Sequence, residues 1–237
     1  MPPKVEIREL RVEFSRWGQS VRALEHVDLA IDAGEWVMVV GNNGSGKSTL
    51  LRAIAGQGLV SAGTIRIAQP ERDSAAQNFD SAVFFVTQDP LAGTADGLTL
   101  LENLIAADPS PSSARAGAGT RARQTVYSEL MDLFGLQSRH GQLLKYFSGG
   151  ERQQIAILIA KLRNPSLLLL DEPFAALHAE RIPTCLRILS AMHSKGCTIV
   201  QITHDMSVIN GYGNRKVVLE KGKVVSDVSI NGGESTE

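Results

Sequence analysis

The chain has 237 residues, of which 43% are hydrophobic and 21% charged, values that indicate a folded globular protein with a sizeable core. Its formal net charge of −1 lacks the basic excess that a phosphate backbone requires, so we expect no nucleic-acid partner. The start of the chain has no apolar signal segment, and no apolar run approaches the roughly 18 to 20 residues of a membrane-spanning helix, so any role at a membrane would require another subunit.

The first part of the chain predicts an antiparallel β region followed by a buried parallel strand. Between residues 5 and 31, apolar and polar residues alternate in short pieces, which is typical of strands with one exposed face. The run at residues 36–40 has no alternation, as expected for a parallel strand that is covered on both faces. Similar runs follow at residues 82–86, 167–170 and 198–202, with helical patterns between them. We therefore predict an α/β fold with a central parallel sheet and an N-terminal antiparallel β subdomain.

A long central stretch has no strand pattern. We interpret it as an inserted α-helical subdomain, residues 89–147, within a single domain that spans residues 1–237. Helical patterns lie near residues 99–107 and 121–134, and the segment between them is rich in Pro, Ser, Gly and Ala, which predicts a surface loop.

The last part of the chain predicts a well-defined helix start and a closing hairpin. Residues 151–163 place apolar side chains at helical spacing, and Ser148 with Glu151 has the S-x-x-E form of a capping box. Two short apolar strands around a Lys221-Gly222 turn predict the hairpin at residues 216–225.

A glycine-rich loop between a buried strand and a helix carries the first chemical motif. Backbone N–H groups of such a loop point at phosphate oxygens, and the helix that follows adds its positive end. Lys47 would supply a charge for the β- and γ-phosphates, and the Ser48 hydroxyl would be a ligand for Mg²⁺. The loop, which matches G-x-x-x-x-G-K-[ST] and predicts a nucleoside triphosphate site, consists of Gly41, Asn42, Asn43, Gly44, Ser45, Gly46, Lys47 and Ser48, and Thr49 continues into the helix.

Two adjacent carboxylates end the buried run at residues 167–170. Ligands of parallel sheets bind at the carboxyl ends of the strands, which is where Asp171 and Glu172 are expected to lie. Asp171 can hold the metal ion, directly or through water, and Glu172 can orient and deprotonate an attacking water molecule. The adjacent Glu favours hydrolysis of the nucleotide over transfer of a phosphoryl group to a second substrate.

A second glycine-flanked helix start occurs at Phe147-Ser148-Gly149-Gly150-Glu151. A Ser and two glycines at a helix N-terminus form an anion site. Because the chain already has one phosphate site, this second one would meet a phosphate bound by another copy. Beside the two motifs above, the segment resembles the signature of the ABC (ATP-binding cassette) family, usually L-S-G-G-Q, with Phe and Glu at two variable places.

The resemblance covers about residues 5–230 and implies a P-loop NTPase core that binds ATP and Mg²⁺ and works as a sandwich dimer. In such a dimer, Ser148, Gly149 and Gly150 of one subunit complete the nucleotide site of the other. Gln88 resembles the Q-loop glutamine, which reaches the metal and the water and passes the nucleotide state to the helical subdomain. The resemblance also implies that His204 contacts the γ-phosphate. It implies that Phe14 stacks on the adenine ring, and Trp17 is the alternative to Phe14.

One position departs from the family pattern. After Glu172-Pro173 the family commonly has an S/A-A-L-D segment, whereas here Leu177 is followed by His178. The Asp normally helps to couple the two nucleotide sites of the dimer. A His is larger and only partly charged near neutral pH, so the resemblance leaves the hydrolysis rate and the cooperativity open.

Among ABC proteins, a single compact cassette favours a transporter subunit. Residues 88–104 resemble a group of importers labelled tryptophan/tyrosine-type, which work with an extracytoplasmic solute-binding protein. The resemblance therefore implies a homodimer or a paired cassette subunit, an integral membrane permease, import of a small solute, and a cytoplasmic position on the inner face of the cell membrane. Two alternatives remain open: a soluble ABC ATPase acting in a cytosolic assembly process, and a regulatory nucleotide-binding module with little turnover.

Overall fold

The computed structural model describes residues 4–16, 19–58, 60–68, 82–89, 94–109 and 121–230, which form two compact units. The first unit comprises Met1–Phe85, Ser166–Glu172 and His193–Glu237, and the second comprises Val86–Pro165 and Pro173–Met192. The second unit thus includes the predicted helical insert together with segments that follow it. The bounds of the insert, residues 89–147, stay a prediction.

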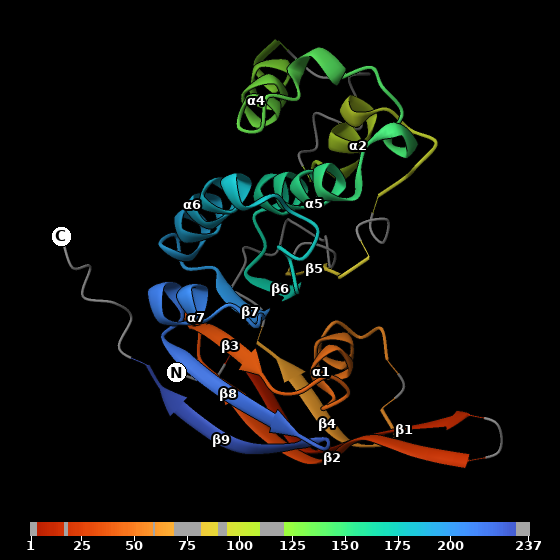
Figure 1. Ribbon diagram of the computed structural model, residues 1–237, viewed down its shortest axis with the longest axis vertical. Helices are drawn as coiled ribbons and strands as arrows, with labels where there is room; N and C mark the ends of the chain where they lie inside the picture. The colour runs from red at the N-terminus through yellow and green to blue at the C-terminus, as the bar shows by residue number, and fades with distance from the viewer. Residues whose placement is uncertain are drawn as a thin grey trace. The chain divides into compact units, whose positions relative to one another are not determined.

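Two sheets build the first unit (Figure 1). In the smaller, antiparallel sheet, β1 (Val5–Arg16) lies between β2 (Gln19–Ile31) and β4 (Ala62–Ile67). In the larger sheet, β6, β7, β3 and β8 run parallel, and β9 is antiparallel to β8. The predicted parallel core, antiparallel N-terminal region and closing hairpin are confirmed. In spatial order, the larger sheet consists of β5 (Val83–Val86), β6 (Leu167–Asp171), β7 (Thr198–Ile202), β3 (Trp36–Val40), β8 (Arg215–Glu220) and β9 (Lys223–Ser229).

An apolar cluster joins both sheets to α1 (Lys47–Ile54). Side chains alternate between the two faces of a strand, so Val37 and Val39 of β3 enter this cluster while Trp36 lies on the opposite face. There the Trp36 ring contacts the rings of His193 and Tyr212, with centroids 5.5 and 5.6 Å apart. Tyr212 ends α7 (Met206–Tyr212), which covers this face. Burial on both faces explains why the β3 sequence has no polar alternation.

The second unit is helical. Its long helices are α2 (Leu100–Ala107), α4 (Arg121–Asp132), α5 (Gly149–Arg163) and most of α6 (Ile182–His193), and its short 3₁₀ segments are η2 (Gln137–Arg139), η3 (Leu144–Tyr146) and η4 (Ala179–Arg181). Thr99 begins α2 with a capping box. The buried Asp108 carboxylate connects the end of α2 to α4, since it accepts hydrogen bonds from Arg123 Nε at 2.7 Å and Tyr127 Oη at 2.6 Å. The predicted helices are confirmed, whereas most of the predicted loop lies outside the described residues.

Candidate functional site

The glycine-rich loop connects the carboxyl end of β3 to the first turn of α1. Glycine is required at two of its positions. A Cβ on Gly41, where φ is 147°, would lie 2.1 Å from the Leu219 carbonyl oxygen, and a Cβ on Gly46, where φ is 104°, would lie 2.5 Å from the Ala23 carbonyl oxygen. Gly46 is the N-cap of α1, and no side chain in the described ranges caps this helix. The first N–H groups of α1 are therefore left for an anion.

The Lys47 side chain folds back along the backbone of the glycine-rich loop. Its ammonium group donates to the carbonyl oxygens of Gly41 at 2.8 Å and Asn42 at 3.0 Å, and the residue is only 6% exposed. Ser45 is also buried, and its Oγ has no hydrogen-bond partner in the part of the chain that the structure describes. A buried cation and an unsatisfied buried hydroxyl are costly unless a polar ligand compensates them, and phosphate oxygens are suitable acceptors for both. The exposed residues Asn42, Asn43 and Gly44 form the rim of the loop.

Asp171 at the end of β6 meets the first turn of α1. Ser48 Oγ donates to Asp171 Oδ1 at 3.1 Å, and Asp171 is 2% exposed. Burial raises the pKa of the Asp171 carboxyl group, while the hydrogen bond from Ser48 acts in the opposite direction. No group of three His, Cys, Asp or Glu residues in the described ranges could hold a metal ion by itself. The site fits Mg²⁺ nevertheless, because Mg²⁺ uses one or two protein oxygens together with substrate phosphates and water.

Glu172 and His204 lie at the carboxyl ends of the neighbouring strands β6 and β7. Glu172 adopts a φ of 48°, which is uncommon for a residue with a Cβ, and its N–H donates to the Ile202 carbonyl oxygen at 3.2 Å. His204 Nε2 lies 3.3 Å from Glu172 Oε1, and both side chains are partly exposed. The fold of the first unit therefore brings the predicted base and the predicted γ-phosphate contact together, on the same sheet that carries the phosphate loop.

Phe14, the predicted adenine contact, lies in β1 opposite Val21 of β2. Its side chain is 43% exposed, so the ring is available for stacking. Its rival Trp17 lies outside the described residues, and the role of Phe14 stays a prediction.

The second glycine-flanked helix start belongs to the second unit. Ser148 Oγ accepts from the Glu151 N–H at 3.3 Å, and Glu151 Oε2 accepts from the Ser148 N–H at 2.8 Å, so the predicted capping box is confirmed. A Cβ on Gly150 would lie 2.6 Å from the Ala176 carbonyl oxygen, whereas Gly149 has space around it.

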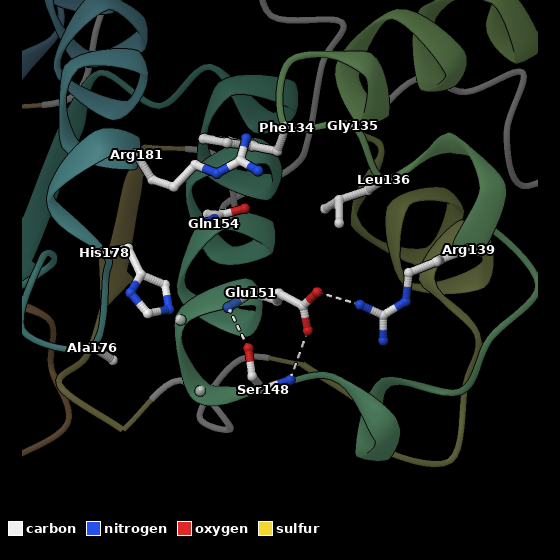
Figure 2. A pocket seen from close by; sticks show the side chains of 12 residues that line it. Phe134, Gly135, Leu136, Arg139, Ser148, Glu151, Gln154, Ala176, His178 and Arg181 are labelled. Carbon is white, nitrogen blue, oxygen red and sulfur yellow. Dashed lines mark hydrogen bonds and ion pairs between the residues drawn. The ribbon is translucent and has the colours of Figure 1, made fainter.

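This turn lines a cavity of about 550 Å³, shown in Figure 2. His178, at the position that departs from the family pattern, lies on its wall with Arg181. Arg139, which also lines the cavity, was missed by the sequence motifs because its partner Glu151 lies 12 positions further along the chain, beyond the spacing of any local motif.

Gln88 also belongs to the second unit, where it is exposed just after β5. The predicted nucleotide contacts of Gln88, Ser148, Gly149 and Gly150 remain predictions. No helix within the described ranges is long and apolar enough to cross a membrane.

Comparisons with known proteins give consistent matches. A family model described as "ABC transporter" matches residues 24–175. The oligopeptide transport ATP-binding protein OppD of Mycobacterium bovis is 32% identical over 98% of this chain, which spans only 39% of that relative's length. The tyrosine transport ATP-binding protein of Clostridioides difficile is 31% identical, and the match covers 94% of this chain and 91% of that protein. A solved dimeric, post-hydrolysis ATP-binding cassette bound to ADP and Pi is 26% identical with a TM-score of 0.80, over 97% of this chain and 100% of the other.

Proposed function

Because the chain belongs to the ABC transporter family, we propose that it binds and hydrolyses ATP as a dimer and drives transport through a separate membrane permease. The observation that carries this proposal is the arrangement at the carboxyl edge of the larger sheet. There the phosphate loop, the Ser48–Asp171 pair and the Glu172–His204 pair all belong to one compact unit. A loop for phosphate, oxygen ligands for a metal and a base for water are what hydrolysis of a nucleoside triphosphate requires.

In this proposal, the α1 N-terminus and Lys47 bind the β- and γ-phosphates. Ser48 and Asp171 would hold Mg²⁺, which supplies neutralisation of the phosphate charge when bound, and Gln88 would join them. Glu172 accepts a proton from the attacking water, and His204 beside it orients the carboxylate and contacts the γ-phosphate. Phe14 would stack on adenine.

The dimer is proposed because, within the described residues, two glycine-flanked helix starts lie in separate units, and the one at α1 already belongs to the phosphate loop. Ser148, Gly149 and Gly150 would receive the γ-phosphate of ATP bound to a second copy, or to a paired cassette subunit. The likeness to a dimeric cassette with ADP and Pi supports this arrangement.

Transport is proposed from the relatives. The names of similar proteins refer to tyrosine transport, oligopeptide transport and methionine import, which supports import of a small solute. Other similar proteins are called macrolide export proteins, so the names do not agree on a direction of transport. The proposal of import therefore rests on the importer-type resemblance of residues 88–104. The proposed partners are an integral membrane permease, which would hold the chain on the cytoplasmic face of the membrane, and an extracytoplasmic solute-binding protein.

The test of transport is capture of the permease. Cysteines are introduced at exposed positions of the second unit, such as Leu98 and Tyr146, in cells that express the neighbouring genes, and cross-linked proteins are identified by mass spectrometry. Cysteines at exposed Val225 and Val228 of β9, in the first unit, serve as the matched control. We expect the cysteines at Leu98 and Tyr146 to cross-link to an integral membrane protein, and the control cysteines in β9 not to do so. Capture of soluble proteins only would instead favour a soluble ABC ATPase that acts in a cytosolic assembly process.

A further inference from the structure

Arg139 of η2 contacts the α5 helix start and the residues just before it, and Figure 2 shows its interaction with Glu151. Its Nη1 forms an ion pair with Glu151 Oε1, and its Nη2 donates to the Tyr146 carbonyl oxygen at 3.2 Å. The guanidinium carbon lies 3.9 Å from the centroid of the Phe147 ring, close enough for a cation–π contact. Its Nε donates to Gln142 Oε1 at 2.7 Å. The guanidinium group therefore connects η2 with both sides of the Ser148 cap.

The two residues that depart from the usual L-S-G-G-Q string, Phe147 and Glu151, are both Arg139 contacts. The Phe ring provides a face for the guanidinium group, and the carboxylate provides its counter-charge. Phe147, Glu151 and Arg139 therefore form one cluster of three side chains.

Glu151 has two opposite effects on an anion site at this turn. Its carboxylate completes the capping box and interacts favourably with the positive end of α5. A negative charge in the first turn also repels a phosphate that approaches the same N–H groups. Gln would cap the helix equally well without this repulsion, because a capping box accepts either residue.

We propose that Arg139 is a positioning residue that neutralises Glu151, so that the Ser148–Gly150 turn can receive the phosphate of a nucleotide held by a second copy of the chain. This inference rests on the proposed function of that turn. The side chains of Arg139 and Glu151 are each 29% exposed, so dissolved salt partly screens the ion pair. We therefore expect a moderate effect on the affinity for phosphate. The other charged or titratable side chains that line the cavity are Arg181 and His178. With Glu151 neutralised by Arg139, Arg181 leaves the wall with a net positive charge, which favours an anion.

The experiment measures the ATP concentration at which the full-length chain dimerises, with Glu172→Gln as the parent so that ATP persists. Sedimentation velocity across an ATP series gives the half-maximal concentration. We expect Arg139→Gln to raise it roughly fivefold at low salt, and the increase should shrink as ionic strength rises. Arg139→Lys keeps the charge and should stay within about twofold of the parent.

The double variant Arg139→Gln/Glu151→Gln decides between an electrostatic and a merely structural role. If Arg139 acts by neutralising Glu151, removal of both charges restores dimerisation to within about twofold of the parent, because the introduced glutamine still caps α5. If Arg139 only braces Phe147 and Tyr146, the double variant stays as impaired as Arg139→Gln, and the inference is overturned. Binding of a fluorescent ADP to the phosphate loop and the melting temperature serve as controls for the first unit and for folding.

A further variant separates this inference from the function on which it rests. Gly149 has space for a side chain, so Gly149→Glu should fold, yet it places a carboxylate where the phosphate is proposed to bind. Loss of ATP-driven dimerisation in Gly149→Glu supports the proposed role of the turn, whatever Arg139 does. Dimerisation as in the parent would refute that role and the Arg139 inference together.

Discussion

The two glycine-flanked helix starts of this chain differ in what satisfies their first N–H groups. At α1 the N-cap is Gly46, no side chain in the described ranges caps the helix, and Lys47 adds a cation. At α5 the Ser148 and Glu151 side chains cap the first turn, and an acidic residue lies within it. Uncapped N–H groups need a ligand, whereas capped ones are already largely satisfied.

We infer from this difference that the two units have different roles, one in nucleotide binding and the other in dimerisation. We propose that the uncapped α1 start, with Lys47, holds a nucleotide within one chain. In the proposed dimer, a phosphate at the α5 start would compete with the Ser148–Glu151 cap, so we expect its affinity there to be weaker and to depend on a nucleotide already held by another copy. A change at the first site should therefore abolish binding, and a change at the second should affect dimerisation.

The largest effect is expected from a substitution that removes the proposed catalytic base and leaves both helix starts unchanged. Glu172→Gln should lower kcat by about 10²- to 10⁴-fold, because the amide cannot act as a base. ATP affinity should be retained, and the dimer should accumulate with ATP and Mg²⁺. Steady-state phosphate release and size measurement test both points, and near-wild-type turnover would remove Glu172 from the mechanism.

Lys47→Ala breaks the α1 site alone. It removes the cation that we propose faces the β- and γ-phosphates, and we expect the dissociation constant for ATP to rise roughly 100-fold. Calorimetric titration measures the affinity, and far-UV circular dichroism checks the fold. An affinity equal to that of wild type would show that this loop does not hold the nucleotide.

Asp171→Asn tests how much stability the first unit loses by burying the carboxylate that we propose as a metal ligand. A raised carboxyl pKa means that the folded state favours the protonated acid, so stability is lost as pH rises from about 3.9 through the folded-state pKa. Above that range, the uncharged Asn should raise the free energy of unfolding of the nucleotide-free chain by on the order of 1 kcal/mol. Urea denaturation at several pH values tests this, and a wild-type chain that is more stable than the variant at neutral pH would contradict it.

The smallest effect is expected at the wall of the α5 cavity. His178→Asp restores the acidic group that the family commonly has there, and we expect it to change the ATPase rate about two- to threefold and to alter the Hill coefficient. The assay requires the cognate membrane subunit. Equal rates and equal Hill coefficients would mean that His178 fills the position of the Asp through contacts of its own.

Sequence patterns predicted the elements whose cause is local. The unalternated strands follow from burial on both faces, and the α5 start follows from Ser148 and Glu151 at capping-box spacing. The phosphate loop was recognisable because its glycines and Lys47 lie within eight consecutive residues, Gly41 to Ser48. Asp171 and Glu172 were recognisable because they end a buried apolar run. In each case, the residues that determine the structure are neighbours in sequence.

Only the tertiary structure decided which distant side chains meet. Ser48 and Asp171 are 123 positions apart, yet a hydrogen bond joins them because α1 packs beside β6. Arg139 was not singled out by any motif, and its contacts with Phe147 and Glu151 follow from the path of η2 beside the α5 start. Spacing along the chain determines caps, periodicity and glycine-dependent turns, since these depend on local backbone geometry. Charge pairs depend on how elements pack, so they are determined only when the core brings those elements together.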